Sequence, residues 1–141
     1  MSASVFEYAL LRVVPRVDRG EAMNAGVLLY CRPLGYLGAR VHLDADRLRA
    51  LDPDADPGPI EQALQGIVEV CAATARAGGA AEEEIGRRFR WLTAPRSTVV
   101  QPGPVHTGLT TDPDADADRL LAKLVLPPTP RRRTGTGTGR G

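Results

Sequence analysis

At 141 residues the chain has room for one domain with a hydrophobic core, and 43% hydrophobic and 25% charged residues are typical of a globular protein. No apolar run approaches the roughly 18 residues of a membrane span, and the N-terminus has no basic leader, so we expect a cytoplasmic protein that does not enter the membrane. The net charge of +1 hides an acidic body of net charge −3 and a tail with four arginines, which argues against a nucleic-acid-binding face on the body.

The first 43 residues predict three strands. β-Branched and aromatic residues dominate 5–14, a polar loop containing Gly20 and Asn24 follows, and 25–31 is an unbroken apolar run typical of a central strand covered on both faces. Residues 36–43 alternate, with Leu37 and Ala39 on one face and Arg40 on the other. The short connection at 32–35 predicts that the last two strands form an antiparallel hairpin.

The remaining segments predict mainly helices. Residues 44–51 favour one or two helical turns, 56–79 form the clearest amphipathic helix, and 81–92 form a shorter one. Residues 97–101 are expected to be an edge strand and 102–108 a rigid loop, and a final helix runs from Asp112–Pro113 to Pro127–Pro128. We therefore expect an α+β fold: a small antiparallel sheet of three to four strands with helices packed on one face. The domain would span 1–128, and 129–141 would be a disordered tail.

Two copies of the sequence DPDAD, at 52–56 and 112–116, resemble the start of a calcium loop. Both copies lack the glycine at loop position six and the glutamate at position twelve that an EF-hand requires. Each copy precedes an amphipathic helix, where carboxylates accept free backbone N–H groups and favour the positive end of the helix dipole. We therefore interpret the aspartates as helix caps.

Cysteine and histidine do not form a recognisable metal motif. Cys31 and Cys71 are 40 residues apart and lie in apolar surroundings, which favours reduced, buried thiols. A zinc site built from these two cysteines with His42 and His106 would lack paired ligand spacing. We expect no metal and no cofactor.

Residues 88–108 hold the highest density of functional side chains in the chain, with the sequence RFRWLTAPRSTVVQPGPVHTG. Three prolines stiffen the segment, so that its polar groups are held at low entropic cost, and His106 can exchange a proton near neutral pH. Guanidinium groups near hydroxyls would suit a phosphate or a carboxylate. In the alternative interpretation, Phe89, Trp91 and Leu92 belong to the core, the arginines are solvated or paired with the glutamates at 82–84, and His106 bonds a loop carbonyl. The sequence leaves these two interpretations open.

Two motifs, the pattern R-G-E-x-x-N-x-G-V at residues 19–27 and the segment 88–108, resemble those of the bacterial domain-of-unknown-function family 3037. The resemblance covers roughly residues 5–126. The resemblance implies a small cytoplasmic bacterial protein without an established activity. It also implies a partner, because members look to be encoded beside a HipA-like kinase-fold protein.

Three functional hypotheses follow. The first is a non-catalytic interaction or regulatory module for a kinase-fold partner, with a binding surface made of Arg19, Glu21, Asn24, Arg88, Arg96, His106 and Thr107. The second is an enzyme acting on a phosphate ester or nucleotide, with His106 as general acid or base, Arg96 and Arg88 holding the anion, and Ser97 or Thr107 orienting it.

The enzyme hypothesis requires His106 and Arg96 to converge on one pocket. The third hypothesis is weak, salt-sensitive nucleic-acid binding through Arg131, Arg132, Arg133 and Arg140 of the tail. The body's acidic charge and its few aromatic residues argue against this third function, and the oligomeric state stays open.

Overall fold

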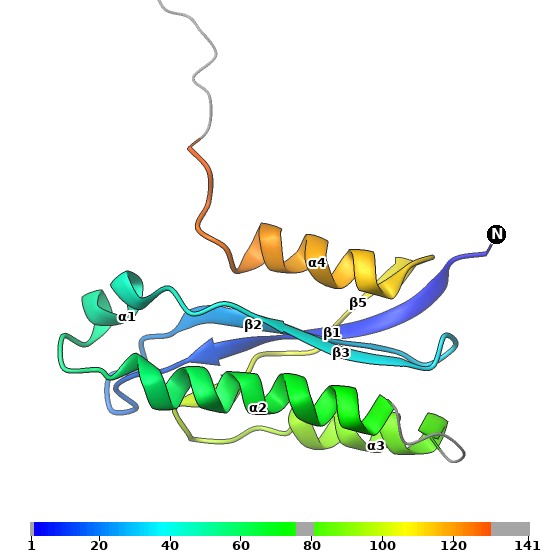
Figure 1. Ribbon diagram of the computed structural model, residues 1–141, viewed down its shortest axis with the longest axis horizontal. Helices are drawn as coiled ribbons and strands as arrows, with labels where there is room; N and C mark the ends of the chain where they lie inside the picture. The colour runs from blue at the N-terminus through cyan, green and yellow to red at the C-terminus, as the bar shows by residue number, and fades with distance from the viewer. Residues whose placement is uncertain (1, 76–80, 131–141) are drawn as a thin grey trace, which may run out of the picture.

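A computed structural model describes residues 2–75 and 81–130 of the chain (Figure 1). Its centre is a five-stranded antiparallel sheet in which β3, β2 and β1 lie side by side and β4 and β5 both pair with the remaining edge of β1. The strands are β1 (Ser4–Val13), β2 (Met23–Cys31), β3 (Tyr36–Val41), β4 (Val100–Pro102) and β5 (His106–Thr110).

Helices cover both faces of this sheet. In Figure 1, α2 and α3 lie below the sheet and α4 lies above it. The helices are α1 (Ala45–Leu51), α2 (Pro57–Ala75), α3 (Ala81–Leu92) and α4 (Pro113–Leu124). The α+β class is confirmed, but the expectation that the helices pack on one face is wrong. No helix in the described ranges is long and apolar enough to cross a membrane.

The central strand β2 explains why both faces need a cover. Because successive side chains of a strand point to opposite faces, Val27 and Leu29 pack against Leu120 of α4, while Leu28 packs against Phe89 of α3 on the other face. Every residue from Ala25 to Cys31 is buried. Burying both apolar rows on one layer of helices is impossible, and α4 supplies the second layer.

The sheet has five strands, not the expected three to four, because part of the predicted 102–108 loop is a strand. β1 is ten residues long, and its outer edge pairs with two short strands separated by a break at 103–105. Gly103 N–H donates to the carbonyl of Leu10 at 2.8 Å within this break. The sequence misled here because Pro102 and Pro104 indicate a loop, yet Pro102 is the last residue of β4, opposite Leu11, and Pro104 lies in the break before β5.

The interpretation of the DPDAD copies as caps is confirmed. Asp112 is the N-cap of α4 and its side chain accepts the backbone N–H of Ala115 at 3.3 Å. Asp56 precedes α2, and its Oδ1 accepts the N–H of Gly58 at 3.0 Å. Each aspartate therefore satisfies a backbone donor that a helix start leaves without an intrahelical partner.

The thiols are buried, as predicted, and they are free. Cys31 packs in the cluster between α4 and the sheet, whereas Cys71 packs in the cluster between the sheet and helices α2 and α3. The sheet therefore separates the two thiols. Burial raises the pKa of the Cys71 thiol to about 12. Cys71 is therefore a small apolar core residue and not a reactive thiol.

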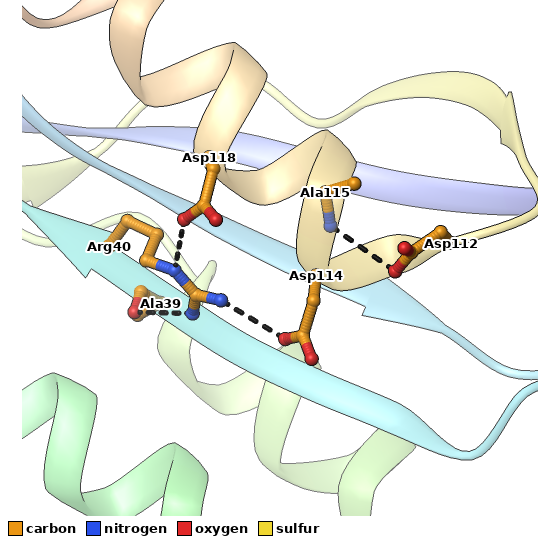
Figure 2. A network of polar contacts seen from close by, with 6 residues as sticks. All are labelled: Ala39, Arg40, Asp112, Asp114, Ala115 and Asp118. Carbon is orange, nitrogen blue, oxygen red and sulfur yellow. Dashed lines mark hydrogen bonds and ion pairs between the residues drawn. The ribbon is translucent and has the colours of Figure 1, made fainter.

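A network of charges fastens α4 to the sheet (Figure 2). From β3, the Arg40 guanidinium donates to Asp118 at 2.8 Å and to Asp114 at 3.0 Å, both on α4, and a third donor reaches the carbonyl of Ala39 at 3.3 Å. At the other end of the helix, the Asn24 side chain donates to the carbonyl of Leu124 at 3.1 Å. These contacts fix α4 along β2 and β3.

Candidate functional site

The surface of α3 carries the largest exposed aromatic side chain of the described chain. Ile85, Phe89 and Leu92 recur at helical spacing and are buried against the sheet. Trp91 follows Phe89 by two residues, about 200° around the helix, and its side chain is 55% exposed. Phe89 and Leu92 are core residues as the alternative interpretation expected, but placing Trp91 in the core is wrong.

Two guanidinium groups flank the exposed indole ring. The Cζ atom of Arg96 lies 4.8 Å from the centroid of the Trp91 ring and that of Arg88 lies 5.4 Å from it. Arg96 also donates through Nη2 to the backbone carbonyl of Trp91. Since cations are attracted to the face of an indole ring, these contacts hold both arginines beside it. We call Arg88, Trp91 and Arg96 the Trp91 cluster.

The other two arginines of α3 are already paired. Arg90 donates both Nη atoms to the carboxylate of Glu7 on β1, at 2.9 and 3.0 Å. Arg87 lies 3.1 Å from Glu83, one helical turn away. The predicted pairing with the glutamates at 82–84 therefore holds for Arg87, whereas Arg90 reaches across to the sheet.

The arginines of the Trp91 cluster differ from these. Among the side chains of residues 2–75 and 83–130, no carboxylate lies within ion-pair distance of Arg88 or Arg96. The Nε atom of Arg88 is buried and has no hydrogen-bond partner there. The cluster thus presents an apolar ring between two guanidinium groups whose charge no carboxylate of the described residues compensates.

His106 lies elsewhere. It is exposed on β5, and its ring centroid is 5.3 Å from that of Tyr8, which packs with Phe6 into the cluster beneath α4. Arg96 contacts α3, on the opposite face of the sheet (Figure 1). His106 and Arg96 do not converge on one pocket, so the geometry required by the enzyme hypothesis is not met.

The hydroxyl residues do not complete a catalytic group either. Ser97 is exposed in the connection after α3, and Thr107 is exposed on β5 opposite Glu7. The expected bond from His106 to a loop carbonyl is absent from the described part of the chain, where the ring contact with Tyr8 is what holds His106. These residues form part of an edge strand and its approach.

Each candidate binding residue of the predicted 19–24 loop has a structural role. Arg19 and Glu21 pair with each other through Nε and Oε1 at 2.6 Å, and both side chains are largely exposed. Between them Gly20 has a φ of +70°, a left-handed conformation that favours glycine. Asn24, half-buried, holds the end of α4. Each of these residues therefore has a role in the loop or in holding α4, and none has a contact with the Trp91 cluster among the described interactions.

The described residues contain no group of three or more histidines, cysteines, aspartates or glutamates that could hold a metal ion. In particular, Cys31 and Cys71 lie in clusters on opposite faces of the sheet, so these two cysteines cannot bind the same metal ion. The tail arginines at 131–133 and 140 lie outside the described residues, and tail binding to nucleic acid stays a prediction.

Sequence reasoning missed the exposure of Trp91. The signal was present in the helical spacing, because the residue two positions after a buried one points away from the core. It also missed the Glu7–Arg90 pair, whose partners are 83 residues apart and for which the sequence holds no signal.

A family model described as a protein of unknown function (DUF3037) matches residues 8–125. The match spans the whole sheet after the start of β1 and all four helices. No curated protein matches the chain significantly, and no solved structure does.

Proposed function

The chain belongs to the DUF3037 family of proteins of unknown function, and from that premise we propose that it is a non-catalytic interaction module for a kinase-fold partner. The Trp91 cluster carries this proposal. Tryptophan and arginine are the residues most enriched among those that dominate binding energy at protein interfaces. Here an indole ring that is 55% exposed stands between two arginines without carboxylate partners in the described residues.

The chemistry of the cluster indicates what the partner surface would offer. The ring supplies apolar area with few rotatable bonds, and each guanidinium has free N–H donors that match a carboxylate. A partner surface with an apolar patch bordered by aspartate or glutamate complements both parts. The kinase-fold identity of the partner comes from the family resemblance, in which members look to be encoded beside a HipA-like protein.

The test is co-expression of the full chain with a HipA-like kinase-fold protein, followed by size-exclusion chromatography and a measured Kd. We expect a stable complex, and we expect Trp91→Ala and Arg96→Ala each to weaken it at least tenfold, since hot-spot truncations cost about 2 kcal/mol or more.

Arg87→Ala is the matched control on the same helix, because Arg87 is paired with Glu83 and lies outside the Trp91 cluster. It should change the Kd less than threefold. Separate elution of the two unmodified proteins would reject the proposal of a kinase-fold partner. An unchanged Kd for Trp91→Ala would show that the partner binds another surface.

A further inference from the structure

A cleft of about 420 Å³ opens at the end of the sheet where β1 ends, and none of the three residues of the Trp91 cluster lines it. Pro15 follows β1, Val99 and Val100 lead into β4, and Ile60 belongs to the first turns of α2. The full lining is Pro15, Asp52, Ala55, Asp56, Pro59, Ile60, Ala63, Thr98, Val99 and Val100. The volume falls in the range of about 300 to 1,000 Å³ that is usual for small-ligand pockets.

The walls of the cleft are held by backbone contacts. Val14 N–H donates to the carbonyl of Val99 at 2.7 Å, which fixes the 98–100 segment beside the end of β1. Ile60 packs against the buried cluster that includes Leu64 and Val13, which fixes α2 on the other side. The cleft is therefore formed by ordered elements, and its lining is largely aliphatic side chains and prolines.

Two carboxylates stand on one side of this apolar lining. One oxygen of Asp52 accepts the backbone N–H of Asp54 at 3.1 Å. One oxygen of Asp56 accepts the backbone N–H of Gly58 at 3.0 Å. Neither forms an ion pair with a cation among the described residues. Each carboxylate therefore keeps an oxygen and a negative charge for an occupant of the cleft.

Backbone pairing is not what the cleft offers. An edge strand can bind a peptide by adding a further strand, through its unpaired N–H and carbonyl groups. Here the Thr98 hydroxyl donates to the carbonyl of Val100 at 2.8 Å and the Gln101 side chain donates to the carbonyl of Thr98 at 2.8 Å. The chain's own side chains already occupy these carbonyls, so recognition rests on the aliphatic lining and the carboxylates.

We propose that this cleft is a docking site for a partner segment that carries an aliphatic side chain next to a lysine or arginine. The aliphatic group occupies the space between Ile60 and Val99, and the cation pairs with Asp52 and Asp56. Charge complementarity selects this occupant, because an anionic or purely polar segment would leave the two carboxylates without a cation and the aliphatic lining exposed to water. The site does not depend on the kinase-fold proposal.

The test uses the full ¹⁵N-labelled chain and a capped hexapeptide, Gly-Leu-Arg-Leu-Arg-Gly, titrated at about 50 mM salt and followed by amide chemical shifts. We expect saturable shifts confined to residues of the cleft, such as Ala63 and Val99. A peptide with glutamate in place of both arginines should not bind. Raising the salt to about 300 mM should weaken the peptide that binds, since exposed ion pairs are screened.

Two variants separate the charges from the apolar lining. Asp52→Asn with Asp56→Asn should weaken binding at least fivefold. Because an asparagine oxygen accepts a backbone N–H as an aspartate oxygen does, the turn after Asp52 and the start of α2 after Asp56 should be retained. Ala63→Phe, which fills the cleft from α2, should abolish binding while both carboxylates stay. Asp18→Asn with Glu69→Gln removes the same charge from exposed positions outside the cleft and should leave binding within twofold.

Three outcomes would overturn the proposal. The first is the absence of cleft shifts up to about 5 mM peptide, and the second is equal binding by the Asp52 and Asp56 variant. The third is peptide binding that appears only when the chain is shortened to end at Pro130. In that case the chain's own arginine tail, and not a partner, would be the occupant that excludes the peptide from the cleft. Trp91→Ala is the control that separates the two proposals. It should leave peptide binding to the cleft unchanged even where it abolishes the complex with the kinase-fold protein.

Discussion

Arg40 and Arg96 are two partly buried arginines with opposite surroundings. Arg40 lies on the α4 side of the sheet, where two carboxylates and a backbone carbonyl accept its donors (Figure 2). Arg96 lies on the α3 side, stacked 4.8 Å from the centre of an exposed indole ring and without a carboxylate among the described residues. An arginine-rich sequence therefore does not by itself mark a binding surface.

The physical reason is how each guanidinium is satisfied. A carboxylate neutralises the charge and fixes the side chain, so Arg40 contributes to fastening α4 onto β3. An indole ring orients the guanidinium without neutralising it, so Arg96 keeps donors and charge for another molecule. Residues of the first kind should therefore control stability, and residues of the second kind should control binding. Three experiments test this distinction.

The largest effect is expected within α3. Phe89→Ala should lower the free energy of unfolding by about 3 to 5 kcal/mol, because it leaves a cavity between α3 and the sheet where the ring is fully buried. Trp91→Ala, two residues away, should lower it by less than about 1 kcal/mol, because its ring is largely exposed. Urea unfolding followed by circular dichroism measures both. A Trp91→Ala cost close to that of Phe89→Ala would show that Trp91 is a packing residue.

An intermediate effect is expected from the two arginines themselves. Arg40→Ala should cost about 1 kcal/mol, since both of its carboxylate partners are largely exposed and such pairs contribute modestly. Arg96→Ala should cost less than about 0.5 kcal/mol. The same unfolding measurements decide the order. If Arg96→Ala were the more destabilising change, the assignment of Arg40 to structure and of Arg96 to binding would be reversed.

The smallest effect is a pH dependence confined to the α4 side. The neighbouring Tyr36 hydroxyl, and then the Arg40 guanidinium, hold the pKa of Asp114 below its ordinary value. A carboxylate with a depressed pKa in the folded state contributes stability above its unfolded pKa, near 3.9, and loses that contribution as the pH falls through its folded pKa.

The destabilisation by Asp114→Asn should therefore be a few tenths of a kcal/mol at about pH 7 and should vanish as the pH falls through the lowered pKa of Asp114. Urea titrations at a series of pH values measure it. Arg96→Ala, with no carboxylate partner, should show a difference from the unmodified protein that is flat over the same range. A pH-dependent difference for Arg96→Ala would reveal an acidic partner for the Trp91 cluster.

The local elements followed closely from the sequence. The alternation in 36–43 placed Leu37 and Ala39 in the core and Arg40 on the other face, and the spacing of Ile85, Phe89 and Leu92 gave the buried side of α3. Capping by Asp56 and Asp112 also followed, because a cap is a contact between residues two or three positions apart. Such features depend on short-range geometry, which the sequence pattern reports directly.

Pairings between distant segments were beyond the sequence. The second edge of β1 is covered by a strand near residue 108, whose proline-rich approach indicated a loop. The unbroken apolar run of β2 did indicate a cover on both faces, yet which helix provided the second layer depended on where the chain returned after β5. No local sequence pattern indicates these pairings, because they depend on which long-range packing buries the most apolar surface.

For the candidate sites the same division holds. The sequence shows which reactive groups are present: arginines, one tryptophan and acidic turns, with no complete catalytic motif. Which of these groups are paired within the fold depends on the tertiary structure. It placed carboxylates against Arg40 and Arg90 and left Arg88 and Arg96 beside an exposed ring. Whether a charge is compensated depends on the distance in space between partners that are far apart in the sequence, and local sequence patterns do not report that distance.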